Sequence, residues 1–397
     1  MPHINYTAVV TMVNSSLLNT NNWNCETVLC STGSLLPDDL GPNATDSYTG
    51  QHLGPEAIII PTIFALIFIV GVIGNGTLVR IVIMDPSMRS VPNIFIASLA
   101  MGDLLLLLVF VPFNAITYMT TSWPLGEGMC KVINCVQVAS TGVSVFTLTA
   151  LSADRYQAIV NPINKKATDM VQRTYTVALL VWVISIMLGI PTLVLATLVE
   201  YENLDGTTVT YCQAIPMGMT VTIQLHTALM FVFLYLVPLA IISVYYVLIA
   251  IKLIGSTKRT IGESLRNENK QLRARKRVAK VVLVFVLIFG ICWLPYHIFN
   301  MMLFFSKDTR YMETYGILFL KFLGTIMAYA NSCVNPLALY FLSNTFKSYY
   351  NKYILCCFVK NKPRNGPAKE YRNNSSFKRS PSRTLTRLTQ RTMVYSV

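Results

Sequence analysis

The stretch NIFIASLAMGDLLLLLVFVPFNAI, residues 93–116, is dominated by apolar side chains and contains one charged residue, Asp103. A run of this length can cross the hydrocarbon core of a bilayer, about 30 Å thick, as one α-helix. Six further stretches share this character, and the seven run over 57–83, 93–116, 132–153, 175–199, 221–251, 278–305 and 315–342. We therefore expect an all-α membrane protein built as a seven-transmembrane helix bundle.

The composition of the 397-residue chain supports a membrane protein. Hydrophobic residues make up 53% and charged residues 13%, with a mean hydropathy of +0.51, which is too little charge for the surface of a soluble domain of this size. The net charge of +14 is confined to certain segments, whereas a nucleic-acid binder would spread its basic residues over a folded face. Nucleic acid is therefore excluded as a partner.

Charge in the loops predicts the orientation. The segment 252–280 is strongly basic, and the tail from Phe346 onward has twelve Lys or Arg against the single acid Glu370. Residues 1–54 and the loop 200–220 contain acids and no base. By the positive-inside rule we expect a multi-pass plasma-membrane protein with its N-terminus outside and its C-terminus in the cytoplasm. No cleavable signal peptide is visible in residues 1–54.

Four regions are expected along the chain: a tail over 1–55, the bundle over 56–343, an amphipathic helix with a palmitoylation site over 344–357, and a cytoplasmic tail over 358–397. Sequons predict glycosylation at Asn5, Asn14 and Asn43. Cys356 and Cys357 follow the amphipathic helix, where palmitoylation is expected; two unmodified thiols are the alternative. Serines and threonines in the basic tail are candidates for phosphorylation.

Asp103 is the single acid in the central part of the expected spans. A carboxylate in hydrocarbon is costly and is usually functional. We expect a small polar cavity that holds a sodium ion, formed with Ser144, Asn331, Ser332 and Asn335. The alternative is a neutral Asp103 hydrogen-bonded between helices. No other cofactor or metal site is expected, since the four histidines are scattered.

Asp154-Arg155-Tyr156 ends the third span on its expected cytoplasmic side. The tripeptide alone is weak, and its value is positional. Arg155 can pair with Asp154 at rest and turn toward the carbonyls of a partner when the helices separate. An interfacial arginine that merely reaches out to water is the alternative. The loop that follows contains Pro162 and Ile163.

Prolines predict kinks in three spans. The sixth span contains FGICWLP, residues 289–295, in which Trp293 lies just before Pro295 and Phe289 lies one turn below Trp293. A kink there can couple the shape of a pocket to movement of the inner half of the helix. Pro238 in the fifth span and the pair Asn335-Pro336 in the seventh span are expected to act in the same way.

Taken together, these motifs resemble the rhodopsin-like receptors. The resemblance covers roughly residues 56–357 and is carried by GN at 74–75, LAMGD at 99–103, Trp123, Cys130, the 154–156 tripeptide, Trp182, Cys212, Pro238, Tyr246, CWLP at 292–295 and NP at 335–336. Within that superfamily, GVSVFTLTALS at 142–152, VPN at 91–93 and NSCVNPLALY at 331–340 resemble the bombesin receptors of vertebrates and the CCHamide receptors of insects.

The resemblance implies a receptor that a secreted neuropeptide activates. It implies coupling through heterotrimeric G proteins, chiefly of the Gq class, to phospholipase C and calcium. It also implies a disulfide between Cys130 and Cys212, a G-protein contact that includes Tyr246, and receptor kinases and arrestin as partners of the phosphorylated tail.

Two departures from the family pattern bear on activation. The tyrosine of the last-span motif is expected three residues after Pro336, where Leu339 stands and Tyr340 follows. The base of the sixth span reads RARKR at 273–277, with no acid to lock Arg155. We therefore expect repulsion in place of a lock, and easier activation without ligand.

The expected ligand site excludes two familiar ligand classes. Gln137 stands where amine receptors have an aspartate, and Tyr329 stands where opsins have the Schiff-base lysine. What remains is a wide polar mouth suited to an amidated peptide, lined by Asn134, Gln137, Glu200, Glu202, Tyr296, His297, Asn300, Lys321 and Tyr329. Leu303 and Thr325 replace arginines of vertebrate bombesin receptors, which favours the CCHamide side.

Other classes of protein fit less well. A transporter or channel is disfavoured because no internal repeat relates the two halves. An enzyme is not expected, because the sequence has no paired carboxylates, metal-spaced histidines or nucleophile elbow. Within the receptors, a receptor for another regulatory peptide, such as a member of an endothelin-like group, is the alternative.

Overall fold

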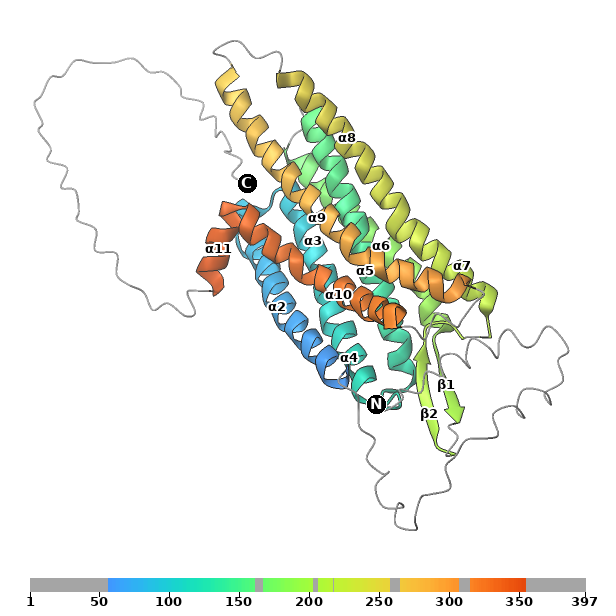
Figure 1. Cartoon of the computed structure of the whole chain (residues 1–397). Coiled ribbons are helices and arrows are strands. Elements are labelled where there is room, and N and C mark those ends of the chain that lie inside the picture. The colour runs from blue at the N-terminus through green and yellow to red at the C-terminus, as the bar shows by residue number, and fades with distance from the viewer. Residues whose placement is uncertain are drawn as a thin grey trace, which may run out of the picture.

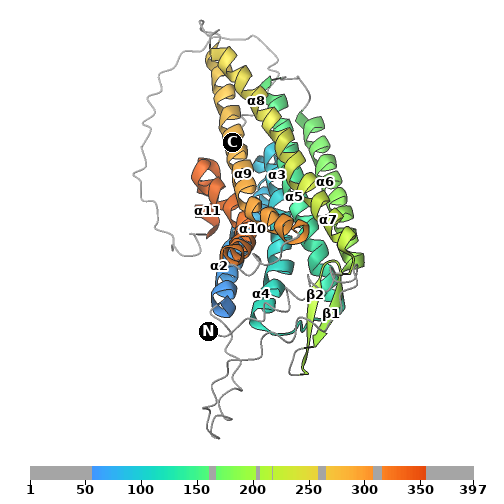
Figure 2. The same ribbon diagram turned by 45° about the vertical axis from the view of Figure 1, so that its right-hand side comes forward.

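The computed structural model describes residues 56–160, 167–202, 206–216, 218–257, 265–306 and 315–354. Within those ranges seven helical spans are long and apolar enough to cross a membrane, as predicted. They are α2 (Glu56–Met84); α3 (Val91–Leu105) continued by η3 (Leu106–Phe110) and α4 (Val111–Met119); α5 (Gly126–Val160); α6 (Ala167–Leu195); α7 (Thr220–Phe231) continued by η4 (Val232–Leu236) and α8 (Val237–Thr257); α9 (Leu265–Phe305); and α10 (Tyr315–Leu342). Figures 1 and 2 show them packed side by side.

The bundle has an apolar outer surface and polar residues inside. Large hydrophobic side chains such as Val221 and Phe341 are more than three-quarters exposed. In contrast, Asn75, Asp103 and Asn335 are buried. An apolar exterior with polar residues inside is the reverse of a soluble protein and suits a lipid environment, because a polar group facing lipid would lack a hydrogen-bond partner.

Two spans contain a π-helical turn just before a proline. η3 precedes Pro112, and η4 precedes Pro238. Proline has no N–H, so the carbonyl four residues earlier loses its usual helical donor. Those carbonyls lie inside the two turns, where a wider turn accommodates the mismatch. A kink was predicted at Pro238 in the fifth span, and the structure has a π turn with one extra residue just before this proline.

Between α6 and α7 the chain forms a two-stranded antiparallel hairpin, β1 (Thr197–Glu202) and β2 (Thr208–Gln213). The expected fourth span, 175–199, is therefore wrong at its end, because α6 stops at Leu195. The sequence TLVEYE of β1 contains β-branched and aromatic residues, which favour a strand. Its apolar residues extended the hydrophobic run of α6 and concealed the change of structure. The six other expected spans lie within helices.

The two ends of the bundle differ, and we name them the hairpin end and the α11 end (Figure 1). α11 (Asn344–Ile354) follows α10 almost directly and lies within the region 344–357 in which the amphipathic helix was expected. It buries Phe346 and Tyr350, and the Tyr350 hydroxyl donates to the Gly74 carbonyl 3.1 Å away.

α8 and α9 project past the other helices at this end (Figures 1 and 2).

A turn beside α11 also fixes its position. The turn η2 (Pro86–Met88) follows α2, and Asp85 before it accepts hydrogen bonds from Ser87 and from the Tyr349 hydroxyl of α11. The hydrogen bonds from Ser87, followed by that from Tyr349, lower the pKa of Asp85. The same contact with Asp85 raises the pKa of the Tyr349 phenol.

Candidate functional site

Asp103 in α3 lies at the centre of a polar cluster inside the bundle. Its side chain is 1% exposed. The Ser332 hydroxyl donates to its Oδ1 at 2.9 Å, and the Asn335 amide donates to its Oδ2 at 2.8 Å. Ser144 of α5 lies within hydrogen-bonding reach of the carboxyl group. Asn331 is buried on α10, the helix that also carries Ser332 and Asn335. The structure thus brings the acid together with polar groups of α5 and α10.

Asn75 of α2 extends this cluster and was not among the predicted site residues. Its amide donates to the Ser332 carbonyl at 2.8 Å and to the Gly71 carbonyl at 3.0 Å, while its buried Oδ1 has no protein partner within the described residues. The pair at 74–75 was a sequence signal for this role. Carboxylate, hydroxyl and amide oxygens are the donors that a small hard cation prefers, so this chemistry fits a sodium ion.

An aromatic cluster lies around the proline kink of α9. The Trp293 ring is 6.0 Å from that of Phe289, 5.6 Å from Tyr296 and 6.1 Å from His297, between ring centroids. Two buried polar atoms, Trp293 Nε1 and His297 Nε2, have no hydrogen-bond partner within the described residues. Such atoms are costly to leave unpaired in a finished core. They are therefore available to a water molecule or a ligand.

The fifth span closes this cluster from the side. Tyr235 in η4 donates to the Gly290 carbonyl at 2.9 Å, and its ring lies 4.9 Å from that of His297. Sequence reasoning did not single out Tyr235. The π turn that presents it has no sequence signal beyond the following proline.

α10 packs directly on the kink of α9. A Cβ added to Gly324 would lie 2.8 Å from the Tyr296 nitrogen and 3.0 Å from the Pro295 carbonyl carbon. Only glycine permits this approach without a shift of one backbone. The backbones of α9 and α10 therefore touch at the kink with no side chain between them.

The predicted ligand residues divide into two groups. Tyr296 lies within hydrogen-bonding reach of both Gln137 and Asn300, so α5 and α9 meet there. Lys321 is partly buried in α10, with Nζ 5.9 Å from the centre of the Phe322 ring. Glu200 and Glu202 are exposed on β1.

The remaining three make contacts elsewhere in the bundle, and two of them are buried. Asn134 donates to the Cys130 carbonyl at 2.8 Å, beneath the hairpin. His297 is buried in the aromatic cluster. Tyr329 is 3% exposed, with its ring centroid 5.3 Å from that of Phe64 and 5.2 Å from that of Phe110.

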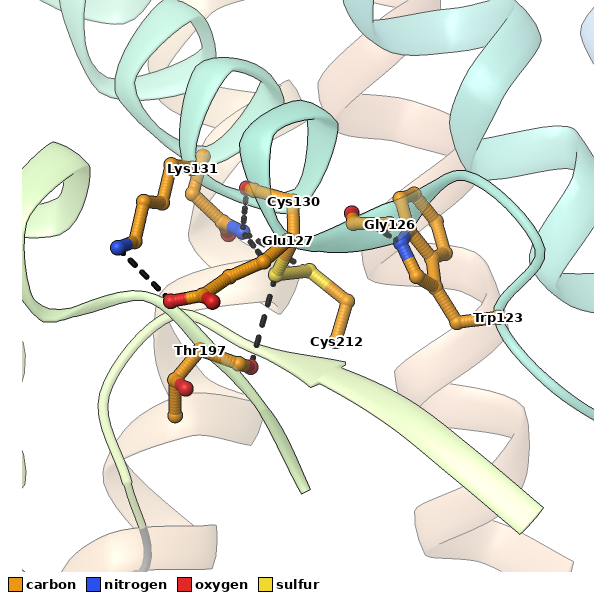
Figure 3. Close-up of a disulfide and its surroundings, with 8 residues drawn as sticks. Trp123, Gly126, Glu127, Cys130, Lys131, Thr197 and Cys212 are labelled. Atoms are coloured by element: carbon orange, nitrogen blue, oxygen red, sulfur yellow. Dashed lines mark hydrogen bonds and ion pairs between the residues drawn. A yellow bond between two sulfur atoms is a disulfide. The ribbon is translucent and has the colours of Figure 1, made fainter. Parts of the chain in front are cut away.

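A disulfide joins the hairpin to α5, which confirms the predicted pair Cys130–Cys212 (Figure 3). The cysteines are 82 residues apart in sequence. Trp123 adds a second attachment, because its backbone N–H donates to the Thr210 carbonyl of β2 at 2.8 Å. Its indole N–H donates to the Gly126 carbonyl at 2.9 Å (Figure 3). The hairpin is thus fixed to the start of α5.

At the α11 end, the Arg155 guanidinium pairs with the neighbouring Asp154 carboxylate and is only 7% exposed. The Tyr246 hydroxyl of α8 donates to the Ala279 carbonyl of α9 at 2.9 Å. Tyr156 packs against Tyr245, with ring centroids 5.4 Å apart. α5, α8 and α9 therefore meet around the predicted coupling residues.

The sequence predicted that the base of α9 would be repelled from α5, but the structure shows a hydrogen bond between the two helices. Arg275 Nη1 donates to the Ala158 carbonyl of α5 at 2.8 Å. The two helices are thus joined by a base of α9 and a backbone oxygen of α5, and Arg155 takes no part in this contact. The prediction of repulsion is wrong for Arg275, because a backbone carbonyl can accept its hydrogen bond where no acidic side chain is present.

Tyr340, which follows the position of the usual last-span tyrosine, contacts α11. Its hydroxyl donates to Asn351 Oδ1 at 3.2 Å, and its ring lies 6.2 Å from that of Tyr350. Pro336 packs against α2, where a Cβ on Gly74 would approach it to 2.7 Å. The predicted residues Asn5, Asn14, Asn43, Pro162, Ile163, Cys356 and Cys357 lie outside the described residues.

Seven spans, a disulfide-fixed hairpin at one end and a paired arginine at the other define a seven-transmembrane receptor. Residues 74–340 match the model of the 7 transmembrane receptor (rhodopsin family). The chain is 40% identical over 331 residues to bombesin receptor subtype-3 of Ovis aries, covering 82% of each chain. It is 42% identical over 300 residues to a bombesin receptor of Bombina orientalis, covering 75% of this chain and 76% of that one.

The chain therefore belongs to the rhodopsin family of G-protein-coupled receptors, in the group of the bombesin receptors, and is a multi-pass plasma-membrane protein. These are receptors and not enzymes, as the sequence predicted.

Proposed function

We propose that this receptor is activated by a secreted neuropeptide of the CCHamide or bombesin kind. The observation that carries the proposal is the identity of 40–42% to receptors whose names specify bombesin. Leu303 and Thr325, in place of the arginines of vertebrate bombesin receptors, favour a CCHamide-like peptide. The polar groups of Gln137, Tyr296 and Asn300 would bind an amidated C-terminus above the unpaired nitrogens of Trp293 and His297.

Coupling is proposed to run through Arg155 to a G protein of the Gq class, with phospholipase C and calcium as the output. In the described state Arg155 is paired with Asp154 and buried. Separation of α9 from α5 would break the contact of Arg275 with Ala158 and expose Arg155 to the carbonyls of a G protein.

The hairpin end is proposed to lie outside the cell and the α11 end in the cytoplasm. Basic residues at 252–280 support this orientation, as does the disulfide, which persists in an oxidising compartment. Glycosylation of Asn5, Asn14 and Asn43, palmitoylation of Cys356 and Cys357, and phosphorylation of the tail for arrestin binding follow from the same orientation.

A sodium ion is proposed as a modulator of the resting state. The residues that would hold it are Asp103, Ser144, Asn331, Ser332 and Asn335. The ion would supply a positive charge to the buried carboxylate and so stabilise the packing of α3 against α10.

The test is expression of the full chain with a panel of amidated and cyclic peptides and recording of calcium release. A response to a CCHamide or bombesin peptide at nanomolar concentration is expected. A response to an endothelin-like peptide alone would replace the ligand assignment. Arg155→Ala should abolish the calcium response and leave peptide binding at the surface intact, whereas persistent signalling would remove Arg155 from the mechanism.

A further inference from the structure

A cavity of about 390 Å³ lies between α9 and α10 at the α11 end. Four basic residues line it, together with three apolar ones. The basic strip, as we call it, consists of Arg273, Lys276, Arg277 and Lys280 of α9, and the apolar wall consists of Val281, Phe341 and Leu342. The volume is at the small end of the range of about 300–1,000 Å³ for small-molecule sites.

The basic strip faces away from the centre of the bundle. Its members recur at helical spacings of three and four residues, so they share one side of α9. Val278, Ala279 and Val282, on the opposite side of the same turns, are buried in the bundle. The strip is therefore separate from the face on which Arg275 contacts α5 and from the coupling residues around Arg155.

Nothing in the described part of the chain neutralises the basic strip. The salt bridges within those residues are Lys131 with Glu127 and Arg155 with Asp154, and neither involves the strip. Four uncompensated cations around one cavity are repulsive unless an anion is bound there.

The cavity lies where the basic part of α9 gives way to an apolar run. Lys280 is the last lysine or arginine of α9, the run VVLVFVLIF follows it, and the facing helix α10 ends at Leu342. Phe341, one residue before that end, is 76% exposed, and Leu337, one helical turn earlier, is 44% exposed. The cations of the strip thus adjoin an exposed apolar ridge, the same pairing of charge and hydrocarbon that an anionic phospholipid presents.

We propose that this cavity binds the headgroup of an anionic phospholipid of the inner leaflet. The basic strip would bind the phosphate groups, and the ridge of Leu337 and Phe341 would contact an acyl chain. The assignment to the inner leaflet rests on the proposed orientation. A lipid bound here would contact both α9 and α10. It would therefore stabilise the arrangement of the two helices in which the cavity fits the headgroup.

The test measures lipid retention by the full-length receptor, purified and placed in phosphatidylcholine nanodiscs with increasing amounts of phosphatidylinositol 4,5-bisphosphate. Mass spectrometry of the released receptor counts the bound lipid. Each lysine near an anionic surface contributes about 1 kcal/mol to binding. Lys276→Gln with Lys280→Gln should therefore weaken lipid retention about thirtyfold, or about 2 kcal/mol. The matched control is Arg173→Gln with Lys252→Gln, two exposed bases on α6 and α8, which should retain lipid as the wild type does.

Two further arms distinguish the sources of the anion. Phe341→Ser should weaken retention of the lipid while leaving binding of soluble inositol trisphosphate unchanged. Equal affinity for the soluble headgroup and the lipid would overturn the proposal of a lipid, and so would an equal loss in the control variant.

A protein partner is the remaining alternative. If the double variant retains lipid normally and instead loses G-protein binding in detergent, the strip belongs to a protein interface and the proposal is wrong. The lipid assay needs neither peptide nor G protein, so its failure would leave the receptor assignment intact.

Discussion

The hairpin end and the α11 end of this receptor are held in different ways. At the hairpin end a disulfide and the backbone of Trp123 fix β1 and β2 to α5. At the α11 end, α9 is held to its neighbours by hydrogen bonds such as those of Arg275 and Tyr246. A covalent bond does not exchange on the time scale of signalling, whereas a single hydrogen bond contributes about 1 kcal/mol. The hairpin end is thus fixed covalently, whereas the α11 end is held by contacts that can exchange.

The largest effect should come from removing the covalent attachment. Cys130→Ala frees the hairpin, and closing a loop of 82 residues contributes about 4–5 kcal/mol by chain entropy, or more than about a thousandfold in an equilibrium constant. We expect specific peptide binding to disappear and the thermal unfolding temperature to fall. The measurements are radioligand binding and a thermal unfolding curve of the purified receptor.

Cys292→Ala serves as the control, because Cys292 is a free, half-buried cysteine of α9. If Cys130→Ala binds peptide as well as this control does, the hairpin end is not fixed by its disulfide.

The second effect concerns the polar cluster between the two ends. Asp103→Asn keeps the shape and the acceptor for Ser332 but removes the negative charge. Coupling between two sites is typically 1–3 kcal/mol, so sodium chloride should lower agonist affinity about 5–150-fold in the wild type and leave it unchanged in the variant. Agonist binding at matched ionic strength in sodium and in N-methylglucamine salts measures this. A sodium effect that survives in Asp103→Asn places the ion elsewhere.

A smaller effect is expected at the α11 end. Arg275→Met removes the hydrogen bond to Ala158 with little change in length. Loss of about 0.5–1.5 kcal/mol from the closed state should raise basal signalling about 2–12-fold. Inositol phosphate accumulation without peptide measures it at equal surface expression. Lys252→Met, an exposed base on α8, is the control and should keep the basal level of the wild type. Unchanged basal signalling in Arg275→Met would mean that this contact does not restrain α9.

The smallest effect concerns α11 itself. The pKa of Asp85 is lowered by Ser87 and Tyr349, so its contribution is present above its usual pKa of 3.8 and is lost as the pH falls through the lowered value. The pKa of Tyr349 is raised, so its contribution is present below its usual value of 10 and is lost as the pH rises through the raised value. Hydrogen exchange of α11 should therefore be slow at neutral pH, relative to its intrinsic rate, and faster in acid.

Tyr349→Phe should raise exchange in α11 slightly at neutral pH and reduce its acid dependence. Tyr175→Phe, on the exposed face of α6, removes an equivalent hydroxyl and should leave α11 unchanged. Identical exchange in the two variants would remove the contact with Asp85 from the docking of α11.

The spans could be predicted from the sequence because a helix that crosses the hydrocarbon core must be about 20 residues long and almost entirely apolar. The same rule makes polar side chains in a span rare, which is why Asp103, Ser332 and Asn335 could be chosen as a group. The hairpin was missed since β1 continues the apolar run of α6. The partner of Arg275 could not be found, because a backbone carbonyl has no sequence signature. His297 and Tyr329 were expected at an open mouth, and only the packing of the helices shows them buried.

The π turns η3 and η4 have a consequence for the genetics of this receptor. Each contains one residue more than an α-helical turn would, so the side chains beyond it are out of phase with those before it. Deleting a single codon within η3 would convert it into an ordinary α-helical turn, and the outer part of the span would keep its facing, with the amide of Asn114 still near the Tyr329 hydroxyl, from which it is now 3.4 Å away. The same deletion in a regular part of the span would rotate the outer part by about 100° and carry that amide away from α10.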